Sequence, residues 1–150
     1  MKGIWNNAGL WRLATLVALV AIVLMYVFSP LASRSQPTFL AVLQPQQGVN
    51  SGGWIVEVAP DRSVRLTPLG RTDVPANRAL QLWTLASQAD GPKSVGLAKP
   101  DDISLFQPDA LATIGPDQLF EISVEQPGGS PTGLPTGPVL FKGTATESLK

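Results

Sequence analysis

Residues 118–126 read QLFEISVEQ and show the strictest alternation of apolar and polar residues in the chain. Three apolar side chains fall on one side of an extended chain and three polar ones on the other: Phe120, Ile122 and Val124 against Glu121, Ser123 and Glu125. A period of two residues is typical of a half-buried β-strand. We therefore expect a strand here, with its apolar face in a core and both glutamates on the surface.

Similar short patterns lie on both sides of this stretch. The expected strands are 38–43, 54–59, 64–69, 78–86, 94–98 and 139–144. Pro60 to Ser63 is expected to be a hairpin turn, because Asp at such a position can hydrogen-bond two residues on. Residues 99–117 are interrupted by proline and are expected to form loops and edge pieces. Some seven strands without helical periodicity after Phe28 predict an all-β domain, an antiparallel β-sandwich or barrel.

The segment 78–86 (RALQLWTLA) differs from the other expected strands because it is apolar on both faces, apart from Gln81 and Thr84. This pattern is typical of a central strand that is covered on both sides. We accordingly expect Trp83, like Trp54, to be a core aromatic residue rather than a ligand-stacking one.

A long apolar run, LATLVALVAIVLMYVF at 13–28, lies in an uncharged window that extends from 13 to 33. As a helix, 21 residues reach roughly 31 Å, the thickness of a bilayer's hydrocarbon core. Lys2 and Arg12 precede it, which favours a cytoplasmic N-terminus. We expect a cytoplasmic segment 1–12, a transmembrane helix 13–33 and a periplasmic domain 34–150, in a single pass through a bacterial inner membrane. A cleaved signal peptide and a buried core helix are the alternatives.

Composition excludes several classes of function. The chain has no cysteine and no histidine, which removes disulfides, thiolate or imidazole zinc sites and histidine-based triads. After residue 34 the chain has 8 basic and 11 acidic residues, spread along it, so no nucleic-acid footprint is expected. The pair Asp101 and Asp102 is expected to be a solvated turn. We expect no enzyme, no catalytic residue, no metal and no cofactor.

The segment 127–138 (PGGSPTGLPTGP) combines proline and glycine in an unusual density. It lacks the Lys-Ser/Thr that a phosphate-binding loop needs after its last glycine. A rigid connector is one interpretation, and a partner-binding loop is the other. The residues of the candidate partner-binding loop are Gly128, Gly129, Ser130, Pro131, Thr132 and Gly133.

Three segments resemble the extracytoplasmic domain of the anti-sigma-K factor (RskA-type) family. They are LQLWTL at 80–85, DGP with SVGL at 90–97, and EQPGGSPTGLPTGPV at 125–139, which carries most of the specificity. The resemblance extends from about Phe39 to Ala145 and includes the apolar segment before it. It implies a cytoplasmic part that holds a sigma factor silent, one membrane helix, and an outer domain that governs stepwise proteolysis.

The chain departs from the family pattern at its start, where about twelve residues precede the expected span and the family's zinc-ligating residues have no counterpart. No sigma-contacting residue can be transferred. We therefore expect a single-pass membrane regulator whose partners are the membrane, a sigma factor or a separate anti-sigma chain, and envelope proteases. The alternative is a membrane-tethered β-sandwich that acts as a binding or adaptor module of the cell envelope.

Overall fold

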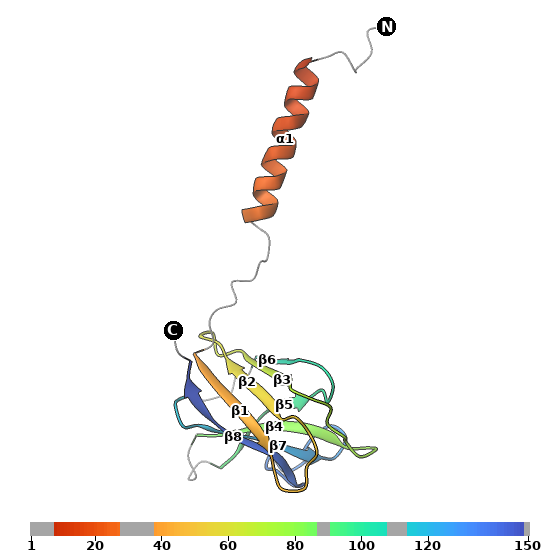
Figure 1. The fold of residues 1–150 in the computed structure, drawn as a ribbon, viewed down its shortest axis with the longest axis vertical. Helices are drawn as coiled ribbons and strands as arrows, with labels where there is room; N and C mark the ends of the chain where they lie inside the picture. Colours follow the sequence, from red (N-terminus) through yellow and green to blue (C-terminus); the bar gives the residue numbers. More distant parts are fainter. Residues whose placement is uncertain (1–7, 28–37, 87–90, 108–113, 149–150) are drawn as a thin grey trace. The chain divides into compact units, whose positions relative to one another are not determined.

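A computed structural model describes residues 8–27, 38–86, 91–107 and 114–148. The chain divides into two compact units, Met1–Ser35 and Gln36–Lys150. The first contains the helix α1 and the second contains all eight strands (Figure 1).

The helix α1, Ala8–Val27, begins five residues before the expected start at Leu13. The expected residues 28–33 lie outside the described residues. Among the helices of the described part, none combines the length and hydropathy that a membrane crossing requires. The transmembrane helix predicted over 13–33 is therefore not supported by the structure.

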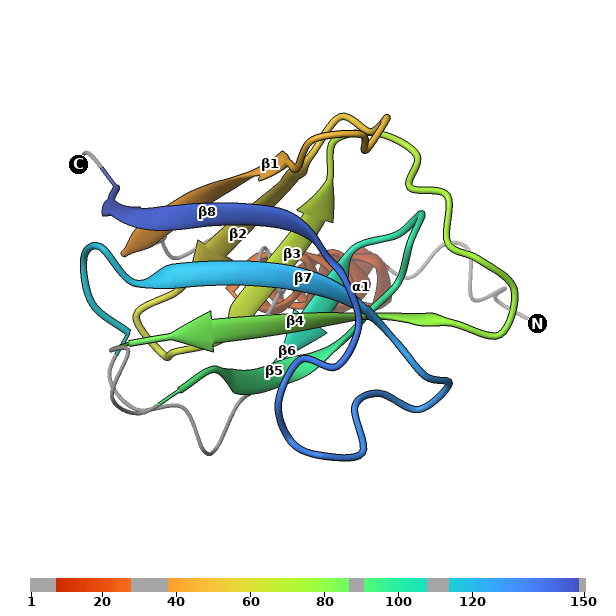
Figure 2. The same ribbon diagram turned by 90° about the horizontal axis from the view of Figure 1, so that it is seen from below.

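The eight strands form one sheet in the order β5-β4-β7-β8-β1-β2-β3-β6, and every neighbouring pair is antiparallel. The strands are β1 Phe39–Pro45, β2 Trp54–Val58, β3 Val64–Pro68, β4 Ala79–Leu85, β5 Lys93–Ala98, β6 Ser104–Phe106, β7 Leu119–Glu125 and β8 Val139–Glu147. The sheet curls so that its two edge strands approach each other, as Figure 2 shows. The result is a nearly closed barrel, which decides between the two architectures expected from the sequence.

Each expected strand is present. The last strand, β8, continues three residues beyond the expected end at Thr144. The extra length has a structural reason, because β8 pairs with β7 between Val139 and Thr144 and with β1 between Phe141 and Glu147. The segment 99–117 was expected to form loops and edge pieces. It contains β6, which is an edge strand of the sheet and pairs with β3.

The hairpin between β2 and β3 closes as the sequence predicted. Asp61 Oδ1 accepts hydrogen bonds from the backbone N–H of Ser63 at 2.9 Å and from Ser63 Oγ at 2.7 Å. These bonds lower the pKa of Asp61 below its ordinary value, because they favour the ionised carboxylate. Arg62 has a φ of 66° and completes the turn.

The core lies inside the barrel and consists of inward-facing side chains from all parts of the sheet. The largest are Trp54, Phe120, Phe141, Leu43, Leu66, Leu80, Leu82 and Ile122. Trp54 and Phe141 meet edge to face, with ring centroids 6.2 Å apart and planes at 72°, a favourable geometry for two aromatic rings. Alternation along β2 buries Trp54, Val56 and Val58 together, as expected.

Candidate functional site

Trp83 is fully buried as expected, yet, unlike Trp54, it does not belong to the core cluster that was expected to contain both tryptophans. Its neighbours Leu82 and Thr84 alternate with it along β4, and Leu82 packs in the barrel core. Trp83 is 0% exposed but is absent from that core cluster. The side chain therefore faces outward and is covered from outside. The expectation of a strand covered on both sides is confirmed.

Residues 126–138, which we call the strap, lie against this outer face. The strap leaves the end of β7, crosses the outer face of β4 and returns to β8 (Figure 2). The backbone N–H of Ser130 donates to Gln81 Oε1 at 2.7 Å, and Gln81 Nε2 donates to Ser94 Oγ at 2.7 Å. A Cβ on Gly129 would lie 2.8 Å from Gln81 Oε1. Glycine is therefore needed where the strap touches the sheet.

The second attachment of the strap is Glu125, the last residue of β7. Its Oε1 accepts hydrogen bonds from the backbone N–H of Thr136 at 3.0 Å and of Gly137 at 3.3 Å. Its Oε2 accepts from Thr136 N–H at 3.2 Å and from Thr136 Oγ1. Glu125 is 1% exposed. The sequence-based prediction that both glutamates of β7 are surface residues is therefore wrong for Glu125, because the strap covers it.

A chain of hydrogen bonds joins the buried tryptophan to this carboxylate. Trp83 Nε1 donates to Ser123 Oγ at 2.8 Å, and Ser123 Oγ donates to Glu125 Oε1 at 2.5 Å. Burial raises the pKa of Glu125, but the hydrogen bonds from Ser123, Thr136 and Gly137 outweigh burial and hold the pKa below its ordinary value. Glu125 is thus ionised at neutral pH, and its charge is stabilised by donors.

The register of the sheet is irregular next to Trp83 and Ser123. The pairing of β4 with β5 shifts between Leu82 and Trp83, and that of β7 with β8 shifts between Ile122 and Ser123. Such bulges change the direction of side chains and are frequent beside functional sites. Here they occur at the two residues that form the Trp83–Ser123 hydrogen bond.

The structure describes all six residues of the candidate partner-binding loop. Gly129 and Ser130 are half-buried against the sheet, whereas Gly128, Pro131, Thr132 and Gly133 are exposed. The three glycines have positive φ, at 90°, 97° and 75° in chain order. Within the loop, Thr132 Oγ1 donates to the Leu134 carbonyl at 3.1 Å, and Ser130 Oγ donates to the same carbonyl. The loop is therefore ordered by its own bonds.

Two exposed leucines lie at this loop. Leu134 is 51% exposed and Leu97 of β5 is 43% exposed. A Cβ on Gly129 would lie 3.2 Å from Leu97 Cδ2, so the strap runs directly past that leucine. The strap has no charged residue. The strap is therefore an uncharged surface with an exposed leucine, and it passes a second exposed leucine of β5.

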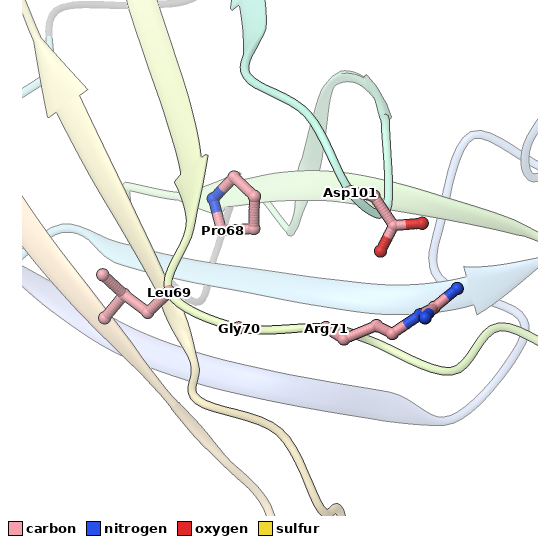
Figure 3. Close-up of a pocket in the computed structure, with 5 residues that line it drawn as sticks. All are labelled: Pro68, Leu69, Gly70, Arg71 and Asp101. Atoms are coloured by element: carbon pink, nitrogen blue, oxygen red, sulfur yellow. The ribbon is translucent and has the colours of Figure 1, made fainter.

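A shallow groove forms a second candidate site (Figure 3). Its lining residues are Pro68, Leu69, Gly70, Arg71 and Asp101. Arg71 and Asp101 extend to the same side of the groove and carry opposite charges. Both are exposed, so they remain solvated and the groove has little power to select a ligand.

Among the described residues, the acidic side chains do not gather into a metal site. Asp101 and Asp102 are both exposed, as expected of a solvated turn. Asp102 Oδ1 accepts from the backbone N–H of Ile103 at 2.7 Å, and its Oδ2 lies 3.6 Å from Lys99 Nζ. In the part of the chain that the structure describes, no group of three ligand-type side chains could hold a metal ion.

By fold, the chain is an all-β protein with a nearly closed antiparallel barrel and one apolar helix earlier in the sequence. The family model described as "Anti-sigma-K factor rskA, C-terminal" matches residues 12–139. The chain belongs to this family of anti-sigma factors, and the resemblance found in the sequence is confirmed. The family is regulatory, and its name implies a sigma factor as partner. No curated protein matches the chain, and no solved structure matches it.

Proposed function

We propose that this chain is a membrane-tethered regulator that controls sigma-factor-dependent transcription through its β-barrel domain, outside the cytoplasm. The observation that carries the proposal is the family match over residues 12–139, which includes both the apolar helical segment and most of the barrel. A protein matched over both parts is proposed to use both, the segment as a tether and the barrel as the regulatory domain.

The charge pattern supports the orientation of the tether. The window 13–33 is uncharged, and Lys2 and Arg12 precede it. Basic residues beside an apolar segment favour the cytoplasmic side. In this arrangement the barrel lies in the periplasm of a bacterial inner-membrane protein, within reach of envelope proteases.

Topology is tested with two fusions after Lys150. Alkaline phosphatase folds only after export, so we expect an active phosphatase fusion and a dark fusion to green fluorescent protein. The matched control lacks residues 13–28, and its phosphatase fusion should be inactive. A fluorescent fusion of the full chain, together with an inactive phosphatase, would contradict the orientation.

Regulation is tested by deleting the gene and measuring transcription from promoters of the sigma factor encoded nearest to it. We expect the deletion to change that transcription and the full chain to restore it. Complementation with the chain that lacks 13–28 should fail. Transcription that is unaffected by the deletion would favour the second candidate, an adaptor module of the envelope, for which the apolar surface at Leu134 and Leu97 is the supporting observation.

A further inference from the structure

The strap, 126–138, is held to the barrel by polar contacts at a few defined places. The backbone N–H of Ser130 is bound by Gln81, and those of Thr136 and Gly137 are bound by Glu125. The strap's return to β8 is fixed by a hydrogen bond from Val124 N–H to the Pro138 carbonyl at 3.0 Å. All of the acceptor side chains belong to the outer face of the sheet.

The barrel core does not include the strap. None of the residues 126–138 belongs to the buried hydrophobic cluster, whose β4 and β7 members, such as Leu82 and Ile122, face the other way. Segments that share few apolar contacts with a core can open at a lower free energy than the whole domain. Opening of the strap would thus remove its hydrogen bonds to Gln81 and Glu125, but would leave the core packed.

The strongest of these attachments is Glu125, because hydrogen bonds to a charged group contribute more than neutral ones. Its two carboxylate oxygens accept bonds from the backbone of two strap residues and from one strap hydroxyl. It is also the only member of the Trp83–Ser123–Glu125 chain that contacts the strap directly in the described hydrogen bonds.

We propose that residues 126–138 open and close as a unit over the outer face of β4 and β7 while the barrel stays folded. In this proposal the hydrogen bonds to the Glu125 carboxylate hold the strap in its closed state. Opening frees the side-chain oxygens of Gln81 and Glu125, two acceptors that each bind backbone N–H groups in the closed state. A partner that binds this uncovered face shifts the equilibrium toward the open state by its difference in affinity for the two states.

Hydrogen–deuterium exchange of the full chain, read by mass spectrometry, tests the proposal. Glu125→Gln keeps the size of the side chain but removes the charge and replaces one acceptor oxygen with a donor NH₂. We expect amide exchange in peptides from 126–138 to accelerate about tenfold, while peptides from β1, β2 and β3 exchange as before. The control is Glu121→Gln, on the same strand and face, because Glu121 pairs with Lys142 at 3.0 Å rather than with the strap.

Two results would overturn the proposal. An unchanged rate of amide exchange in the strap of Glu125→Gln would show that Glu125 does not hold the strap closed. Equal acceleration of amide exchange in the strap and in β1–β3 would show that strap and barrel open only together.

If Glu125→Gln does not fold, Thr136→Val tests the same point. This substitution removes the hydroxyl donor to Glu125 Oε2 and lies at an exposed residue. Unfolding of this milder variant would equally show that the strap is not independent of the barrel. The readout is independent of any effect on a sigma factor.

Discussion

Gly96 of β5 lies against the Cδ1–Cε1 edge of the ring of Phe106 of β6. A Cβ placed on Gly96 would be 2.5 Å from two carbons of that ring. The two residues belong to the edge strands of the sheet, which are not neighbours in its hydrogen-bonding order. The barrel is therefore brought together at this point by a side chain packed on a glycine.

Gly96→Ala should destabilise the domain by about 1 to 3 kcal/mol, because the methyl group has no space beside the ring. The φ of Gly96, 154°, adds to the cost. The measurement is the urea midpoint of the full chain. Gly115→Ala is the control, because a Cβ there meets nothing within 4 Å. In the background of Phe106→Ala the cost of Gly96→Ala should shrink, and additive effects would contradict the contact.

Trp83→Ala should cost about 3 to 5 kcal/mol, since the indole is fully buried between the sheet and its outer cover. A loss of this size is a large part of the stability of an ordinary domain. Equilibrium unfolding in urea measures it. An unchanged midpoint would mean that the indole is solvated rather than buried.

Replacing each buried tryptophan with phenylalanine should have unequal effects. Trp83 Nε1 donates to Ser123 Oγ, whereas Trp54 Nε1 is buried and has no hydrogen-bond partner among the described residues. Trp83→Phe removes a buried bond and leaves Ser123 without its donor, while Trp54→Phe removes a donor that is unsatisfied. We expect the lower urea midpoint for Trp83→Phe. The reverse order would show that Trp54 Nε1 has an acceptor, such as a buried water.

Stability should fall in acid in a way that depends on Glu125. Its pKa is lower in the folded state than its ordinary value of 4.5, so the carboxylate contributes stability that is fully present above about pH 4.5 and is lost as the pH falls through the folded pKa. The charged groups on this face, Glu121 and Lys142, pair with each other. Urea midpoints between pH 7 and pH 3 should therefore fall more for the wild type and Glu121→Gln than for Glu125→Gln. Equal slopes for all three would contradict the assignment.

The strands could be predicted from the sequence because each carries its own pattern. The period of two in 118–126 and in 54–58 identifies strands without any knowledge of their partners. Closure into a barrel instead depends on the contact between Gly96 and Phe106, ten residues apart, and neither residue belongs to a pattern that predicts it. Local patterns therefore identified the strands but could not decide between sandwich and barrel.

The buried state of Glu125 was missed for a related reason. Alternation predicts which face of β7 a residue occupies, but it does not predict what lies on that face. The available signal was in β4, where Trp83 and Gln81 share an outward face that needs a cover. The segment rich in proline and glycine, which begins two residues after Glu125 at Pro127, was the candidate for that cover.

The packing of Phe106 on Gly96 also affects how copies of the molecule meet. A sheet with exposed edges can add a strand from another copy, and continued addition produces aggregates. Here one edge strand has only three residues, and the other faces it across a glycine already covered by an aromatic ring. A foreign strand would have to lie about 4.8 Å from the edge strand that it pairs with, and beside Gly96 the ring takes up that space. The same contact that brings the two ends of the sheet together thus hinders the addition of a strand from another copy at this point of the β5 edge.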